Sequence, residues 1–266
     1  MRLSNVIAAT LALASLAMAT PARAQLVTPN SAGVAMGHVH LVVRNLDAAR
    51  TFLQQLGGTP MKNGTLEIVQ FPGAYVNLRQ GEPTGGTVGS TVNHFGFNVK
   101  KMSDWLPKWQ AAGLTIEPIQ RPTQAYLLGP DGVRVEILED ANIETPIKFH
   151  HVHFFTEDPL ALQAFYVRTF GAVAGKRGNF DAADLPGVNL TFSKSEGPTA
   201  KSMGRVVDHI GFEIRNLEAF VKQLQAAGIK LDREYQRSAA APTLMLAYIT
   251  DPQGTYVELT EGLTPR

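Results

Sequence analysis

The chain has 266 residues, with 24 Lys and Arg against 23 Asp and Glu, and it contains no cysteine. This near-neutral charge without a basic block argues against nucleic acid and anionic membrane surfaces as partners. Without cysteine there are no disulfides and no thiolate metal sites, so any metal held by this chain needs histidine and carboxylate ligands.

Residues 1–24 have the pattern of a secretory signal peptide. A short basic start precedes an apolar run over 6–18, which is too short to span a bilayer. The sequence Ala22-Arg23-Ala24 is the small-x-small pattern that precedes a cleavage site. We therefore predict export to the periplasm or the medium, with cleavage after Ala24 and no membrane association afterwards.

Four similar segments follow, and each begins with a histidine on a short strand of alternating polarity. In chain order they read GHVHLVVRNLDAARTFLQQLGG, NHFGFNVKKMSDWLPKWQAAGL, HVHFFTEDPLALQAFYVRTFGA and DHIGFEIRNLEAFVKQLQAAGI. Each predicts a strand and then an amphipathic helix that ends at a glycine. The histidine and the glycine are 19 or 20 residues apart in every segment, at His38/Gly57, His94/Gly113, His151/Gly171 and His209/Gly228.

Short strands separated by tight turns complete each segment. The turns are Pro-Gly before AYVNL and VNLTF, and Pro-x-Gly before VRVEIL and TYVELT. Proline presets φ and glycine accepts a positive φ, so these sequences favour turns. The repetition predicts an α+β fold of four βαβββ modules. The first module matches the third and the second matches the fourth, so we expect one domain over 33–140 and another over 147–263.

All seven histidines lie in, or next to, the first strand of a module. Alternate residues of a strand share a face, so His38 and His40 point to one side, while Val39 and Leu41 point to the other. We expect the apolar side to pack under the helix and the histidine side to line a cavity. Besides His38, His94, His151 and His209, the set contains His40, His150 and His153, which we interpret as cavity or structural residues.

Glu136 and Glu258 lie on the last strands of the second and fourth modules, among apolar and β-branched residues. A carboxylate there is costly to bury unless it is paired or binds a metal. Two neutral imidazoles and one carboxylate form a facial triad that leaves positions on a divalent ion open for substrate. A single strand histidine is more often structural, but the same residue types recur in both halves. We predict the triads His38/His94/Glu136 and His151/His209/Glu258, which favour Fe(II) and also suit Mn(II) or Zn(II).

These motifs resemble the vicinal oxygen chelate superfamily, which includes glyoxalases, bleomycin resistance proteins and extradiol dioxygenases. The resemblance covers residues 37–263 and rests on HVHLVVRNLDAARTFL, HFGFNV, HIGFEIRNL, PDGVRVEIL and DPQGTYVEL. It implies that two modules form one domain whose mixed sheet curls into a cup. It also implies that a metal in the cup chelates two adjacent oxygens of a small substrate, and that the ligands are those of the two predicted triads.

The resemblance implies competing chemistries. Extradiol dioxygenases have a tyrosine ten residues before the ligand glutamate, where Tyr248 and Tyr126 stand. We predict both as catalytic hydrogen-bond donors, although either position also suits an ordinary strand aromatic, and we add His153 as a catalytic candidate. Those dioxygenases usually have another histidine between the two ligand histidines, and none occurs over 41–93 or 154–208. This absence argues against ring cleavage.

Glyoxalases add a glutamate near the end of the first module, where Asn77 and Asn189 lie at or near the corresponding positions. An amide cannot accept a substrate proton as a carboxylate does, so strict glyoxalase activity is disfavoured. We predict a metal-dependent enzyme with dioxygenase-like or lyase-like chemistry on a small substrate. The alternative is a non-catalytic sequestration protein of the bleomycin-resistance type.

Overall fold

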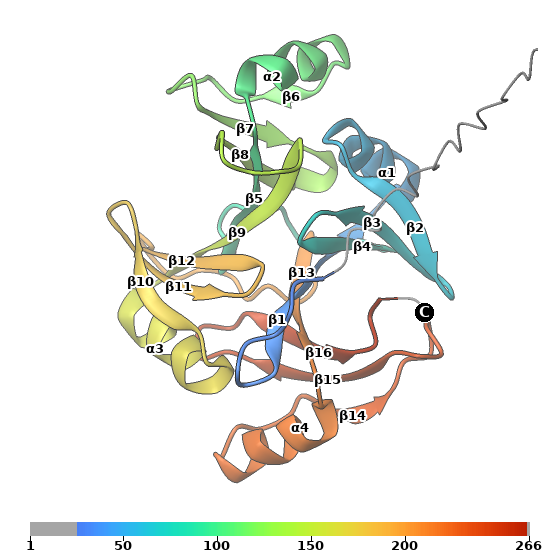
Figure 1. Ribbon diagram of the computed structural model, residues 1–266, viewed down its shortest axis with the longest axis vertical. Coiled ribbons are helices and arrows are strands. Elements are labelled where there is room, and N and C mark those ends of the chain that lie inside the picture. Colours follow the sequence, from blue (N-terminus) through green and yellow to red (C-terminus); the bar gives the residue numbers. More distant parts are fainter. Residues whose placement is uncertain (1–25, 265–266) are drawn as a thin grey trace, which may run out of the picture.

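The computed structural model describes residues 26–264, and the predicted signal peptide lies outside these residues. Within them, four α-helices and sixteen strands form two eight-stranded mixed sheets, which confirms the predicted α+β fold (Figure 1). The four βαβββ modules are also present in the predicted order. No helix of the described residues is long and apolar enough to cross a membrane.

The first two modules occupy the N-terminal half of the described chain. The first contains β1 (Val34–Val43), α1 (Leu46–Gln55), β2 (Thr59–Asn63), β3 (Leu66–Phe71) and β4 (Ala74–Gln80). The second contains β5 (Val92–Val99), α2 (Met102–Ala111), β6 (Thr115–Ile116), β7 (Gln124–Leu128), the 3-10 turn η1 (Pro130–Gly132) and β8 (Arg134–Glu139).

The last two modules repeat this order. The third contains β9 (Ile147–Thr156), α3 (Pro159–Phe170), β10 (Val173–Arg177), β11 (Phe180–Leu185) and β12 (Val188–Lys194). The fourth contains β13 (Val207–Ile214), α4 (Leu217–Ala226), β14 (Arg233–Arg237), β15 (Met245–Thr250) and β16 (Tyr256–Glu261).

The modules pair across the chain rather than in sequence order. One sheet runs β14-β15-β16-β13-β1-β4-β3-β2 and joins the first module to the fourth. The other runs β10-β11-β12-β9-β5-β8-β7-β6 and joins the second module to the third. The junctions are the antiparallel pairs β1–β13 and β5–β9. The expectation that adjacent modules share a cup is therefore wrong, although the boundaries of the predicted segments 33–140 and 147–263 stay predictions.

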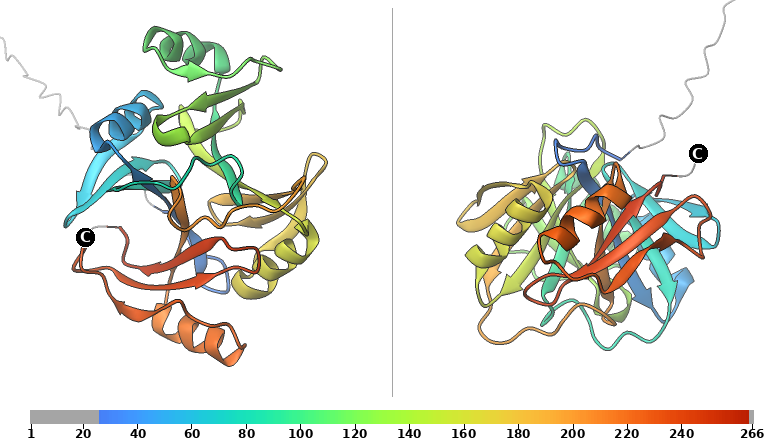
Figure 2. Two further views of the ribbon diagram at one scale, coloured as in Figure 1. Left: turned by 180° about the vertical axis from the view of Figure 1, so that it is seen from behind. Right: turned by 90° about the horizontal axis from the view of Figure 1, so that it is seen from below.

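The helices begin and end where the sequence signals indicate. Asn45, Asp158 and Asn216 each accept a hydrogen bond from the backbone N–H three residues later, as N-cap residues do. Gly171 ends α3 in the left-handed conformation, with φ of 66°. The helices lie at the outside of the molecule, as the views from behind and below show (Figure 2).

The alternation along the first strands separates core from cavity. Val39, Leu41, Ile210 and Phe212 have at most 1% of their surface exposed and belong to the main hydrophobic core. The histidines of β1 and β13 point to the opposite face of the same sheet, because successive strand residues alternate. The core thus fixes the strand rotation that presents the histidines together.

Candidate metal centres

The histidines and glutamates gather in two buried clusters, one in each cup. The first cluster consists of His38, His40, His209 and Glu258, and the second consists of His94, Glu136, His151 and His153. In each cluster one ligand atom from every residue lies within 4.8 Å of the others. All six predicted ligands lie in a cluster, and each cluster gains the second histidine of an His-x-His strand.

The grouping into His38/His94/Glu136 and His151/His209/Glu258 is wrong. His38 lies with His209 and Glu258, because β1 pairs with β13 and β13 pairs with β16. His151 lies with His94 and Glu136 for the corresponding reason in the other sheet. The first histidine of each predicted triad is thus exchanged with that of the other.

A glycine on the neighbouring strand makes room for the deepest histidine of each cluster. His38 lies opposite Gly211, where an added Cβ would stand 2.0 Å from the imidazole Cε1. His151 lies opposite Gly96, where the corresponding distance is 2.2 Å. These are the glycines of the two HxGF motifs, so that motif supplies one histidine and a vacant space for another.

In the first cluster, three side chains converge on one point. The Glu258 Oε2 atom lies 2.9 Å from His38 Nε2 and 3.0 Å from His209 Nε2. Imidazole and carboxylate ligands bind a divalent ion at about 2.0–2.2 Å, so two ligands at right angles stand about 3 Å apart. The observed separations therefore suit three ligands of one metal ion.

Hydrogen bonds outside this triad orient its members. The His209 Nδ1–H donates to Asp208 Oδ1 at 2.6 Å, which directs Nε2 toward the centre. Such carboxylate–histidine pairs fix the tautomer and raise the basicity of a metal ligand. The Tyr248 hydroxyl is hydrogen-bonded to Glu258, which lies directly opposite on β16.

The charges of the first cluster favour a cation. Burial lowers the pKa of His209, but hydrogen bonds to Asp208 and Glu258 outweigh it and raise the pKa to about 9. Burial raises the pKa of Glu258, yet hydrogen bonds to His209 and His38 bring it well below the usual range. Two carboxylates that hold a proton on a buried imidazole can hold a divalent ion in its place.

His40 is the fourth member of the first cluster, and neither of its ring nitrogens has a hydrogen-bond partner among the described residues. Its ring centre is 4.4 Å from that of His209. Burial, followed by the neighbouring histidines, lowers its pKa well below the ordinary value, so His40 is neutral at pH 7. A buried imidazole without partners is costly unless it meets a ligand.

A cavity of about 650 Å³ opens onto the first cluster. Its wall includes His40, Asn77, Asp208, His209, Tyr248 and Glu258. Two further cavities, of about 390 and 510 Å³, are lined by residues of neither cluster. The volume of the first cavity lies in the range of small-molecule sites.

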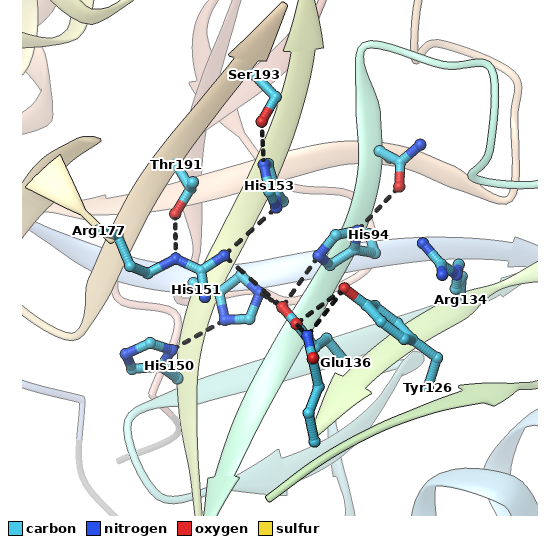
Figure 3. Close-up of polar contacts among 12 residues, drawn as sticks. His94, Tyr126, Arg134, Glu136, His150, His151, His153, Arg177, Thr191 and Ser193 are labelled. Carbon is cyan, nitrogen blue, oxygen red and sulfur yellow. Dashed lines mark hydrogen bonds and ion pairs between the residues drawn. The ribbon is translucent and has the colours of Figure 1, made fainter. Parts of the chain in front are cut away.

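The second cluster has a similar core (Figure 3). The Glu136 Oε2 atom lies 2.8 Å from His151 Nε2 and 3.2 Å from His94 Nε2. The Nδ1 atom of His94 donates to Asn93 Oδ1 at 2.9 Å, and that of His151 is hydrogen-bonded to His150 Nδ1 at 2.9 Å. Here the orienting groups are a neutral amide and an imidazole rather than a carboxylate.

Arg177 reaches into the second cluster and was not expected from the sequence (Figure 3). Its Nη2 atom lies 3.3 Å from His153 Nδ1 and 3.7 Å from Glu136 Oε2. His153 Nε2 is hydrogen-bonded to Ser193 Oγ at 2.8 Å. Burial, the neighbouring histidines and Arg177 lower the pKa of His153 to about 2. An arginine at the end of a short strand carries no sequence signal that separates it from a solvated one.

The predicted catalytic tyrosines both contact a glutamate. The Tyr126 hydroxyl donates to Glu136 Oε1 at 2.9 Å, and Gln124 donates to the same oxygen. Burial and the glutamate raise the pKa of Tyr126 and of Tyr248. Both tyrosines therefore keep their protons at pH 7 and orient a carboxylate. Their catalytic role, like that of His153, stays a prediction.

The two asparagines compared with the glyoxalase glutamate are not equivalent. Asn77 pairs with His40 on the neighbouring strand, whereas Asn189 pairs with His151, two residues earlier in its module. The counterpart of Asn77 is Thr191, which pairs with His153. Asn77 is the one that faces the cavity, and its buried Oδ1 has no hydrogen-bond partner among the described residues.

Comparisons with known proteins agree with this fold. A "putative dioxygenase" from Bacillus subtilis subsp. subtilis str. 168 has a similar structure, with a TM-score of 0.68, 18% identity, and coverage of 90% of this chain and 86% of that one. Glyoxalase I from Zea mays has a TM-score of 0.65 and 17% identity, over 86% of this chain and 92% of that one. At this identity, the likeness shows the fold alone.

The sequence itself matches one family model. No curated protein matches the chain. The model of the Glyoxalase/Bleomycin resistance protein/Dioxygenase superfamily matches residues 148–259, which span the third module and most of the fourth. Over the third module and most of the fourth, the chain is therefore similar to the Glyoxalase/Bleomycin resistance protein/Dioxygenase superfamily, and its first two modules repeat the same order of elements.

Proposed function

We propose that the first cluster binds one divalent metal ion and is the centre of an enzyme acting on a small substrate with two adjacent oxygens. The observation that carries this proposal is the cavity of about 650 Å³ that ends at His40, His209 and Glu258. A ligand in this cavity would reach the open positions that a facial triad leaves on its metal.

Each residue of the first cluster has a distinct part in this proposal. His38, His209 and Glu258 hold the metal, which supplies Lewis-acid polarisation and a template for the two substrate oxygens. Asp208 orients His209 by accepting a hydrogen bond from its Nδ1–H, and Tyr248 orients Glu258 through a hydrogen bond. Fe(II) is favoured by two imidazoles and one carboxylate, and Mn(II) and Zn(II) fit the same set.

His40 is the proposed proton acceptor. It is neutral, it lines the cavity, and both of its ring nitrogens lack partners among the described residues. A neutral imidazole can take the proton of a substrate hydroxyl that metal binding has made more acidic. His40 would fill this part from the ligand strand itself, since no histidine occurs over 41–93.

The remaining cavity wall favours an aromatic, anionic substrate. Tyr248 and Tyr256 stack with ring centres 4.6 Å apart, and both line the cavity. Arg79 and Arg233 also line it, and the guanidinium of Arg233 lies 5.9 Å from the centre of the Tyr248 ring. A catechol with a carboxylate substituent offers two adjacent oxygens, an aromatic face and a negative charge. We therefore propose ring-opening dioxygenation, with dioxygen as co-substrate and both of its atoms incorporated.

Lyase-type chemistry remains the second candidate, because a neutral base beside a polarised oxygen also serves it. Asn77 lines the cavity where a glyoxalase would have a glutamate. Its amide cannot accept a proton as a carboxylate does, which disfavours glyoxalase-type proton transfer. It does not distinguish ring-opening dioxygenation from lyase-type chemistry. Export to the periplasm or the medium is also part of the proposal, and it rests on the sequence of residues 1–24.

The first test combines metal content with oxygen consumption. The mature protein is stripped with a chelator, reloaded anaerobically with Fe(II), and mixed with 3,4-dihydroxybenzoate. Benzoate, which lacks adjacent hydroxyls, is the matched control substrate. We expect oxygen uptake with the first compound alone, and its loss in Glu258→Ala together with the metal. Bound metal and bound catechol without turnover would instead indicate a sequestration protein, while no metal at any site would refute the proposal.

A further inference from the structure

The two clusters have the same four residue types on equivalent strands, but their surroundings differ in charge. In the first cluster, the carboxylate of Asp208 accepts a hydrogen bond from His209 Nδ1. In the second, the amide oxygen of Asn93 accepts the corresponding hydrogen bond from His94 Nδ1. The second cluster therefore has one carboxylate where the first has two.

Arg177 and Arg134, which is paired with Glu117, lie beside the second cluster at strand positions that hold no arginine in the first. The arginines near the first cluster, Arg79 and Arg233, line its cavity instead. The guanidinium of Arg134 lies 3.7 Å from the centre of the Tyr126 ring, at the strand position that Tyr256 occupies beside the first cluster. Arg177 points directly at Glu136 and His153 (Figure 3). The counterpart of Arg177 is Asn63, because each is the last residue of its strand and pairs with the first residue of the next.

The position of Arg177 is fixed by polar contacts. Its Nε–H donates to Thr191 Oγ1 at 2.7 Å, and that hydroxyl donates in turn to Asn189 Oδ1 at 2.6 Å. The remaining amide of Asn189 donates to Asp184 at 2.7 Å. This chain of hydrogen bonds holds the guanidinium with its Nη2 atom toward the cluster.

Arg177 also occupies a ligand atom of the second cluster. Because a guanidinium can only donate, His153 Nδ1 must accept, which leaves the proton of the neutral ring on Nε2 for donation to Ser193. Neither nitrogen of His153 is then free to bind a metal. The equivalent His40 has no partner at either nitrogen among the described residues.

From this contrast we infer that Arg177 is a built-in cation that excludes a divalent metal from the second cluster. Its guanidinium lies 3.7 Å from Glu136 Oε2, the oxygen that a metal ion in this cluster would need. It also donates a hydrogen bond to His153 Nδ1, one of the nitrogens that could bind the ion. The guanidinium of Arg177 and a divalent ion would have to share the one buried carboxylate of Glu136, where screening of their repulsion is weak. The protein therefore binds one metal ion, at the first cluster. That stoichiometry rests on the proposed function, whereas the exclusion at the second cluster does not.

The test is a count of bound metal in the full mature chain. Chelator-stripped protein is dialysed against Mn(II) or Zn(II), and bound metal is measured by elemental analysis. Arg177→Met removes the charge at similar side-chain length, and Arg177→Lys keeps it. We expect about one equivalent for the wild type and for Arg177→Lys, and about two for Arg177→Met. Circular dichroism and the melting temperature establish that each variant is folded.

Two glutamate variants assign the sites. Glu136→Ala should leave the wild-type count at one, while Glu258→Ala should reduce it to zero. In the background of Arg177→Met, Glu136→Ala should return the count from two to one. Two equivalents in the folded wild type, or a count in folded Arg177→Met no higher than that of the wild type, would overturn the inference. No metal in the wild type with one equivalent in Arg177→Met would refute the proposed function and leave the role of Arg177 standing.

Discussion

Replacing Gly211 with alanine should disrupt the first cluster without touching a metal ligand. An added Cβ would stand 2.0 Å from His38 Cε1 and 2.3 Å from His38 Nδ1, so the ring has to move. Overpacking of this kind costs about 1–3 kcal/mol. For a chain of this size each kcal/mol lowers the melting temperature by about 2–4 °C, so we expect a fall of about 2–12 °C.

The same substitution should displace a ligand. His38 cannot keep its ring over Gly211 and its Nε2 atom 2.9 Å from Glu258 at the same time. Metal content and turnover should therefore fall together in Gly211→Ala. The assays are thermal melting of the metal-free protein, elemental analysis of the reloaded protein, and oxygen uptake.

Two further glycines provide matched controls. Gly96→Ala places a Cβ 2.2 Å from His151 Cε1 in the second cluster, so it should lower the melting temperature similarly but leave the metal count unchanged. Gly175 has nothing within 4 Å of an added Cβ, so Gly175→Ala should alter neither quantity appreciably. A Gly211→Ala protein with wild-type melting and wild-type metal content would refute the argument that this glycine creates the space for His38.

Four other predictions follow from the same contacts. Asp208→Asn should weaken metal binding about 10–100-fold in a titration, because it removes the carboxylate that orients His209. His40→Gln should keep the metal and lower kcat by about 10²–10⁴-fold if His40 moves the proton. Arg79→Ala should raise KM for 3,4-dihydroxybenzoate but not for unsubstituted catechol. Burial raises the pKa of Glu213 to about 7 from 4.5, so the folded state holds this proton more tightly than the unfolded state. The free energy of unfolding should then fall as pH rises from about 4.5 to 7, by at most about 3.5 kcal/mol at about 1.4 kcal/mol per pKa unit. Glu213→Gln should flatten that dependence in denaturant titrations at several pH values, and an unchanged slope would contradict it.

The local elements could be read from the sequence because their causes are local. Asn45, Asp158 and Asn216 are caps that satisfy the first free N–H groups of their helices, whatever the rest of the chain does. The alternation in β1 and β13 places histidines on one face and core residues on the other in any sheet that buries the apolar face. The four modules and the six candidate ligands therefore followed from sequence patterns alone.

Arg177 and Asn77 show where such patterns end. Arg177 lies far from Glu136 in the chain, and only the pairing of the second and third modules brings its Nη2 atom to 3.7 Å from that carboxylate. Asn77 and Asn189 occupy similar sequence contexts, but a difference of two residues in register places them differently relative to the first strand. The register of a strand depends on its hydrogen bonds to a neighbouring strand, and the sequence of one strand does not show which strand that is.

The sequence by itself determined the modules, their faces and the kind of ligand each offers, while only the tertiary structure decided which modules share a cup. Each His-x-His strand requires a neighbouring strand with a glycine opposite its first histidine, and both HxGF strands, β5 and β13, have that glycine. Pairing β1 with β5 and β9 with β13 would therefore have met this requirement as well as the observed pairing of β1 with β13 and β9 with β5. What distinguishes them is contact between distant segments, such as Thr65 N–H donating to Ala240 O at 2.8 Å and Asn63 Nδ2 donating to Leu263 O at 3.3 Å. These bonds join the first module to the fourth, and they are selected by shape and register rather than by any local pattern.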